Sequence, residues 1–140
     1  MGAPHSFRRP LRFDEVDAAG FAYFPRIIAL AHEALERMLE DARPGGYAGW
    51  VVRERIGLPC VHLGADFFAP LRFGDEIVVR TRVVSFGQTS VVFEVFVVRG
   101  DGVDCAKIDY VVACAQLDGP TKHPLPASLR EVLERHLMEG

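Results

Sequence analysis

Apolar residues recur at two different spacings along the chain, and the change between them separates helical from extended segments. Between residues 25 and 42 they stand three or four positions apart, which is typical of one face of an α-helix. From residue 60 onward they alternate with polar residues, as the two faces of a β-strand require. The expected strands cover residues 7–13, 60–69, 76–86, 90–98 and 104–117, and a second amphipathic helix covers residues 126–138.

Proline and glycine mark where these segments end. Pro25 stands at the expected start of the long helix, and the Arg-Pro-Gly-Gly run at residues 43–46 ends it. A glycine-rich loop is expected from there to residue 59. The Gly-Asp-Gly run at residues 100–102 predicts a hairpin turn. Pro10 confines the first strand to a sheet edge or a bulge.

This order of elements predicts an α+β fold in which a curled antiparallel sheet wraps around one long central helix, with a further helix at the C-terminus. We expect the four later strands to form a meander. The strand at residues 90–98 is apolar on both faces, whereas a strand with one face in water alternates more cleanly. We therefore expect the second face to be buried against another subunit. No repeat or linker interrupts the pattern, so residues 1–140 are interpreted as one domain.

Composition narrows the class of protein. A chain of 140 residues fits one compact domain. Hydrophobic residues make up 49% of it, and the mean hydropathy of +0.13 is high for so small a domain, which favours self-association. The net charge of −3 argues against a nucleic-acid-binding protein, because phosphate neutralisation requires an excess of Lys and Arg.

Two further classes are not expected. No apolar stretch near the N-terminus has the length of a signal peptide, and no window reaches the length of a membrane span, so we expect a cytoplasmic protein with no membrane partner. The cysteines at 60, 105 and 114 have no CxxC spacing, and we expect them to be reduced and buried. No Cys or His pair stands at ligand spacing, so no metal site is expected.

Three motifs together resemble a known family. Residues 12–25 read RFDEVDAAGFAYFP, an acidic stretch followed by small residues, a glycine, aromatics and the proline that opens the long helix. Residues 66–75 read DFFAPLRFGD, a strand followed by a proline and a Gly-Asp turn. Residues 124–126 read PLP before the last helix. With the order of elements, they resemble the 4-hydroxybenzoyl-CoA thioesterase family of hotdog-fold proteins over nearly the whole chain.

The resemblance implies an acyl-CoA thioesterase and names its catalytic groups. Asp17 matches the family's catalytic aspartate, which acts as nucleophile on the acyl carbon or as general base for water. The resemblance places oxyanion stabilisation on the backbone N–H of Phe24, where the helix dipole supports it, with Gly20 allowing close approach. No cofactor is implied, because coenzyme A is part of the substrate.

Substrate contacts are expected at residues around this motif and farther along the chain. Tyr23, Phe21, Phe67 and Trp50 are candidates for an acyl pocket, and the resemblance brings His62 near that pocket. Where some relatives carry a basic turn that binds the CoA phosphates, this chain has Gln88, Thr89 and Ser90. Their backbone N–H and hydroxyl groups can also bind phosphate, and an acyl-carrier-protein thioester is an alternative substrate.

Two other functions stay open at this point: a non-catalytic module that binds an acyl thioester, and a hydratase or dehydratase. The latter chemistry pairs a histidine with a carboxylate, and the histidine near the long helix is His32. Glu33 is the second candidate for a catalytic acid, whereas Asp14 and Glu15 are expected to stay solvated or to pair with Arg12. The resemblance also implies a homodimer, joined edge to edge with active sites between the protomers, and pairing of dimers into a homotetramer.

Overall fold

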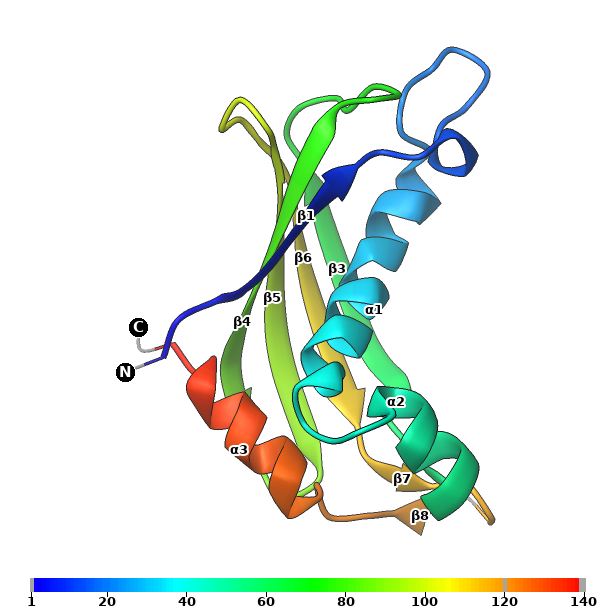
Figure 1. The fold of residues 1–140 in the computed structure, drawn as a ribbon, viewed down its shortest axis with the longest axis vertical. Coiled ribbons are helices and arrows are strands. Elements are labelled where there is room, and N and C mark those ends of the chain that lie inside the picture. Colours follow the sequence, from blue (N-terminus) through cyan, green and yellow to red (C-terminus); the bar gives the residue numbers. More distant parts are fainter. Residues whose placement is uncertain (1, 120, 139–140) are drawn as a thin grey trace.

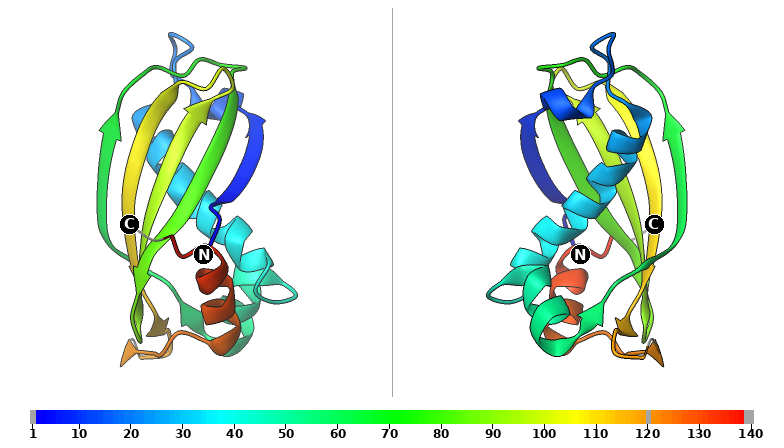
Figure 2. Two further views of the ribbon diagram at one scale, coloured as in Figure 1. Left: turned by 90° about the vertical axis from the view of Figure 1, so that its left-hand side faces the viewer. Right: turned by 90° about the vertical axis from the view of Figure 1, so that its right-hand side faces the viewer.

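Helix α1 lies across the inner face of a curled five-stranded antiparallel sheet (Figures 1 and 2). The computed structural model describes residues 2–119 and 121–138. The strand order in this sheet is β1-β4-β5-β6-β3. Its strands are β1 (His5–Pro10), β3 (Cys60–Phe67), β4 (Glu76–Phe86), β5 (Ser90–Arg99) and β6 (Asp104–Ala113). The expected architecture is therefore the observed one.

Helix α1 (Phe24–Glu40) starts and stops close to the expected positions. Tyr23 precedes it in extended conformation, and Pro25 occupies the first turn, where a missing N–H costs no hydrogen bond. Its buried side faces the sheet and consists of Ile27, Leu30, Ala31, Ala34, Leu35, Met38 and Leu39. At 17 residues the helix is about 25 Å long, shorter than the longest strands of the sheet that it crosses.

Alternation along the central strands separates an apolar inner face from a mixed outer face. In β4 the inward residues Ile77 and Val79 are fully buried, as the period of two predicts. The outward side of β5 is half-buried, but Glu94 interrupts its apolar residues and pairs with Arg82 and with Lys107. The outer face thus carries an ion cluster at its centre, so this strand is not apolar throughout on both faces as expected.

The expected meander is wrong at its first strand. Strand β3 pairs with β6 at the far edge of the sheet, and residues 68–75 cross to β4. The expected long last strand is also divided, because β6 ends at Ala113 and the Cys114 N–H donates to the carbonyl of Thr89. A second sheet of order β2-β7-β8 contains β2 (Ile56–Gly57), β7 (Ala115–Gln116) and β8 (Thr121–Lys122).

The remaining segments also differ in detail from the expected ones. Residues 11–15 leave the first strand, and Phe13–Glu15 forms the short 3-10 helix η1. The expected loop after α1 contains two short helices, α2 (Gly46–Ala48) and η2 (Gly49–Glu54), and the last helix is α3 (Ala127–Arg135). Cys60 is exposed because β3 is an edge strand, so the expectation of three buried cysteines is wrong for this one. Within residues 2–119 and 121–138, no helix has the length and apolar character needed to cross a bilayer.

Candidate active site

Asp17 lies in a tight hairpin of residues 16–22 that joins η1 to α1 and projects from one end of the molecule (Figure 1). Val16 and Ala22 form an antiparallel bridge at its base. Above them the Asp17 N–H donates to the Phe21 carbonyl at 2.8 Å, and the Gly20 N–H donates to the Asp17 carbonyl at 3.0 Å. The backbone of the hairpin therefore fixes the position from which the Asp17 side chain starts.

The Asp17 carboxylate has one oxygen held and one free. Oδ1 accepts the N–H of Ala19 at 2.9 Å and the N–H of Phe21 at 3.2 Å. Among the residues that the structure describes, Oδ2 has no hydrogen-bond partner, and the side chain is exposed. Two backbone donors thus orient a carboxylate whose second oxygen can attack a substrate carbon or accept a proton from water.

Gly20 has a backbone conformation that favours glycine. Its φ of 84° lies in the left-handed region, and a Cβ added there would meet no atom within 4 Å. Its carbonyl accepts the N–H of Phe73 at 2.9 Å, which ties the hairpin to the segment before β4. Gly20 is therefore needed for the shape of the turn, whereas the sequence interpretation assigned it to close approach of the substrate.

The start of α1 leaves one backbone donor unused. Tyr23 donates its N–H to the Glu15 carbonyl at 2.9 Å, and Pro25 has no N–H. The N–H groups of Arg26 and Ile27 both donate to the Tyr23 carbonyl. Within the described part of the chain, this leaves the N–H of Phe24 as the unpaired donor among residues 22–27. Such a donor at a helix N-terminus can stabilise a developing oxyanion.

An aromatic groove of about 410 Å³ adjoins the Phe24 end of the hairpin. Phe21 and Phe24 line one side, and Phe67 and Phe68 come from the end of β3. The rings of Phe24 and Phe67 meet nearly perpendicularly, with centroids 6.4 Å apart. The groove therefore presents ring edges and faces that suit a planar apolar group. Tyr23 is exposed beside it, with its ring 5.7 Å from that of Phe24.

A second groove, of about 500 Å³, lies on the Asp17 side of the same hairpin. Phe13 and Phe73 line it with Asp14 and Asp17, and their rings are 5.5 Å apart. Both phenylalanines are largely exposed. The hairpin thus lies between two shallow apolar surfaces, with Asp17 lining one and Phe24 lining the other.

A buried ion cluster lies behind the hairpin. The Arg9 side chain is 7% exposed and donates two hydrogen bonds to Glu15, at 2.8 and 2.7 Å, and two to Glu33, at 3.0 and 2.8 Å. Arg37 donates a further bond to Glu33 at 3.1 Å. The expectation that Glu15 stays solvated is wrong, because the residue is buried. It does pair with Arg12, through the backbone N–H of that residue, but its ionic partner is the Arg9 guanidinium.

Both carboxylates of this cluster are held in the ionised form. Burial raises the pKa of Glu15, but the bonds from Arg9 and from the Arg12 N–H outweigh it and lower the pKa below its ordinary value. Burial likewise raises the pKa of Glu33, and the bonds from Arg9 and Arg37 outweigh it in the same direction. Glu33, the second candidate acid, is thereby engaged with two guanidinium groups.

The sequence interpretation missed Arg9, although a signal was present. Phe7, Arg9 and Leu11 alternate along the first strand and are all buried in the structure. A charged residue in register with two apolar neighbours points to a buried ion pair. Its partners are distant in sequence, which is why the pattern alone does not name them.

Several expected substrate contacts lie far from Asp17 within one protomer. The hairpin contacts the chain just before β4, whereas Gln88, Thr89 and Ser90 follow the end of this strand, which spans about 35 Å. There the carbonyls of Gln88 and Thr89 accept backbone N–H groups, and Arg130 also donates to Gln88. His62 is exposed on β3, about 16 Å along the strand from Phe67.

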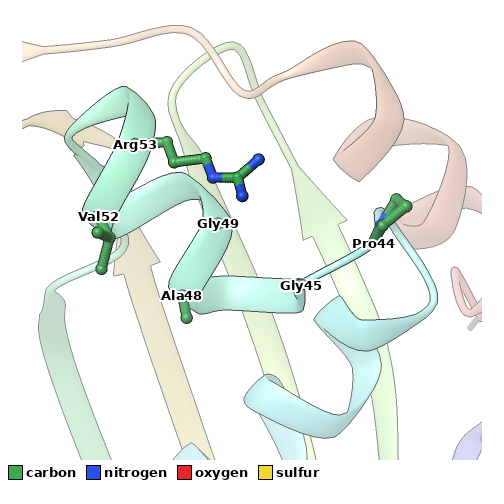
Figure 3. Close-up of a pocket in the computed structure, with 6 residues that line it drawn as sticks. All are labelled: Pro44, Gly45, Ala48, Gly49, Val52 and Arg53. Carbon is green, nitrogen blue, oxygen red and sulfur yellow. The ribbon is translucent and has the colours of Figure 1, made fainter.

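The opposite end of α1 carries another groove, of about 410 Å³, lined by Pro44, Ala48, Val52 and Arg53 (Figure 3). Its lining includes no carboxylate, histidine, cysteine or hydroxyl group that could carry out hydrolysis. Trp50, a candidate for the acyl pocket, is 3% exposed and belongs to the core in this region.

The histidine required for a hydratase is engaged elsewhere. His32 lies about 12 Å along α1 from Phe24. Its Nε2 is 3.2 Å from Glu36, and its Nδ1 is 3.4 Å from the hydroxyl of Tyr110. In the described residues, no group of three His, Cys, Asp or Glu side chains has a metal-binding arrangement.

Comparisons with known proteins identify the family of this chain. The family model of the thioesterase-like superfamily matches residues 11–133. The 1,4-dihydroxy-2-naphthoyl-CoA hydrolase of Nostoc punctiforme is 28% identical over 131 residues, which cover 92% of this chain and 86% of the relative.

Solved structures show the same fold. A gentisyl-coenzyme A thioesterase is 25% identical, with a TM-score of 0.78 over 90% of this chain and 99% of the other. A 1,4-dihydroxy-2-naphthoyl-CoA thioesterase from Synechocystis is 23% identical, with a TM-score of 0.85 over 94% of this chain and 96% of the other. These likenesses confirm the expected hotdog fold class.

Proposed function

The chain belongs to the thioesterase-like superfamily and is an acyl-CoA thioesterase, and we propose that it hydrolyses CoA thioesters of aromatic acids through Asp17 and the backbone N–H of Phe24. The observation that carries the assignment is that two polar groups, without hydrogen-bond partners among the described residues, lie close together in the chain. One is the free oxygen of Asp17, and the other is the unpaired N–H of Phe24, both on the same hairpin–helix junction.

In the proposed reaction, one group acts on the carbonyl oxygen of the thioester and the other on its acyl carbon or on the attacking water. The Phe24 N–H donates to the carbonyl oxygen, and the helix dipole stabilises the negative charge that develops there. In one route Asp17 attacks the acyl carbon, the CoA thiolate leaves, and water hydrolyses the resulting anhydride. In the other, Asp17 takes a proton from the attacking water and returns it to the departing thiolate. Both yield the acid and free CoA, and neither draws on a cofactor.

The aromatic groove supports the choice of acyl group. Phe21, Phe24 and Phe67 line it next to the proposed oxyanion donor. The relatives reported above are named for hydroxylated aromatic acyl groups, dihydroxynaphthoyl and gentisyl. Phe24 carries the proposed oxyanion donor and also lines the groove. The site therefore suits an acyl group whose planar ring is attached directly to the thioester carbonyl.

We propose a homodimer as the active unit, joined through β3. This edge strand exposes Val61 (60%), Leu63 (37%) and Phe67 (47%), an unusual apolar set for an edge that faces water. Antiparallel pairing of two copies of β3 would bring the His62 end of one strand beside the Phe67 end of the other. In that arrangement the expected contact from His62 comes from the second protomer, and pairing of dimers into a homotetramer is a further prediction.

Thiol release from a panel of benzoyl-type and aliphatic acyl-CoAs and acyl-carrier-protein thioesters tests the proposal. Wild type should hydrolyse aromatic acyl-CoAs at least about tenfold faster than the others, and Asp17→Asn should lose about 10²- to 10⁴-fold in kcat, as expected for a lost base or nucleophile. Asp41→Asn is the matched control, since Asp41 is exposed at the far end of α1.

Three results would contradict the assignment. Equal rates for wild type and Asp17→Asn would remove Asp17 from the mechanism. Faster turnover of aliphatic thioesters would overturn the aromatic class, and faster turnover of carrier-protein thioesters would overturn CoA as the carrier.

A further inference from the structure

A single guanidinium joins the two segments that carry the proposed catalytic groups. Arg9, in β1, forms four hydrogen bonds of 2.7–3.0 Å with two carboxylates. One belongs to Glu15, at the end of η1, and the other to Glu33, in the third turn of α1. The fifth N–H of the guanidinium, on Nη1, donates to the Pro10 carbonyl at 3.0 Å. All five N–H groups of Arg9 therefore have acceptors.

Glu15 fixes the segment that leads from η1 into the Asp17 hairpin. It stands two residues before Asp17, and its carboxylate accepts the Arg12 N–H at 2.8 Å in addition to the bonds from Arg9. Its backbone carbonyl accepts the N–H of Tyr23 at 2.9 Å. Glu15 is therefore attached through its side chain to β1 and through its backbone to the residue that precedes α1.

Glu33 fixes the helix. It is bound by Arg9 and by Arg37 at the next turn, and Arg37 in turn lies over the ring of Phe7, 4.1 Å from its centroid. Since α1 is a rigid rod with the Phe24 N–H at its start, holding Glu33 holds the oxyanion donor. Arg9 thus binds both segments, the one that leads to Asp17 through Glu15 and helix α1 with Phe24 through Glu33.

Stability alone is a weak reason for such a cluster. Two arginines and two glutamates balance in charge, but taking them out of water costs free energy that their attraction only partly returns, and apolar side chains of similar size often do as well. Four hydrogen bonds from one planar guanidinium fix the orientation of the two carboxylates relative to each other, which apolar packing does not.

We propose that Arg9 is a positioning residue of the active site, which sets the Asp17 carboxylate relative to the Phe24 N–H by binding Glu15 and Glu33 together. This inference rests on the proposed function of Asp17 and Phe24. Displacement of a catalytic group by about 1 Å costs about 10²-fold in rate, so modest loosening of the cluster should appear in kcat.

The test compares Arg9→Lys with Arg8→Lys. Lysine keeps the charge but cannot form the four bonds of the guanidinium fork. Arg8 is the next residue of the same strand, is exposed, and makes one ion pair with Glu76 at 3.0 Å. Arg9→Lys should lower kcat about 10- to 100-fold with KM changed less than about twofold, because orientation and not binding is lost. Arg8→Lys should leave both constants unchanged.

A second arm separates positioning from general damage to the fold. In an Asp17→Asn background, Arg9→Lys should cause less than about a twofold further loss in single-turnover rate, since one of the two groups that Arg9 sets relative to each other is gone. If Arg9→Lys fails to fold, Glu15→Gln replaces it and should lower kcat about 3- to 30-fold by the same argument.

The outcomes distinguish the two proposals. Unchanged kcat in Arg9→Lys, or an equal loss with and without Asp17, overturns the positioning role while leaving the catalytic role of Asp17 in place. Full activity of Asp17→Asn overturns the proposed function itself and this inference with it.

Discussion

Asp17 and Phe21 are joined by two reciprocal hydrogen bonds. The Asp17 N–H donates to the Phe21 carbonyl at 2.8 Å, and the Phe21 N–H donates back to Oδ1 of Asp17 at 3.2 Å. The second bond leaves Oδ2 as the oxygen available to a substrate. The orientation of the proposed catalytic carboxylate therefore depends on the shape of the hairpin. Substitution of Gly20 should change that shape.

Gly20→Ala should lower kcat, and the matched variant Gly102→Ala should not. Both glycines have positive φ, 84° and 91°, with no atom within 4 Å of an added Cβ, so each substitution should cost about 1–2 kcal/mol of stability through backbone strain alone. Only Gly20 lies in the Asp17 hairpin. Thermal denaturation with steady-state kinetics checks both, and similar kcat values for the two variants would contradict the role of the hairpin.

Acid should destabilise the protein through Glu15 and Glu33. Their pKa values are lowered in the folded state, so the unfolded chain takes up protons first. Their stabilising contribution is complete above about pH 4.5, the ordinary value, and is lost as the pH falls through the lowered folded pKa. Urea denaturation between pH 3 and 6 should show this decline. Glu15→Gln should give a shallower dependence on pH, and an unchanged slope would count against the ion cluster.

Phe67→Ala should weaken binding of aromatic substrates. Removing the ring that meets Phe24 deletes one wall of the aromatic groove, and a loss of about 1.4 kcal/mol corresponds to a tenfold rise in KM. KM for aliphatic thioesters should rise less. Phe96→Ala, on the outer face of the sheet, is the control for loss of a phenylalanine. A parallel rise in KM for both substrate classes would exclude Phe67 from the recognition of the ring.

Val61→Lys should dissociate the proposed dimer. Val61 is 60% exposed on the β3 edge, and a lysine there opposes strand pairing. Val52 is 72% exposed on η2, away from that edge, so Val52→Lys adds the same charge without affecting β3. Sedimentation velocity should give a dimer or larger assembly for wild type and Val52→Lys, and a monomer of low activity for Val61→Lys. A monomeric wild type with full activity would contradict the shared site.

Local patterns in the sequence predicted elements well and their partners poorly. The apolar spacing after Pro25 located α1 within two residues at each end, because capping and periodicity are properties of neighbouring residues. The pairing of β3 with β6 was missed, since a strand's period of two says nothing about which strand lies beside it. Helix η2 was expected as loop, because six residues are too few to display a period.

The same distinction applies to the proposed active site. Asp17, Gly20 and Phe24 come from one continuous motif, so a resemblance over the motif was enough to place them together. Arg9 binds Glu33 from 24 residues away, and only the fold brings the two into contact. The distance between Gln88 and Asp17 was equally invisible, since it depends on the length and direction of β4.

Backbone N–H groups orient the Asp17 carboxylate, and a backbone N–H is also the proposed oxyanion donor. The amides come from Ala19, Phe21 and Phe24, and any residue other than proline supplies them. Under the proposed mechanism, side chains at positions 19, 21 and 24 can therefore vary while these hydrogen-bond donors stay in place. We therefore expect that substitutions at Phe21 and Phe24 can change acyl selectivity while leaving the proposed catalytic groups in place.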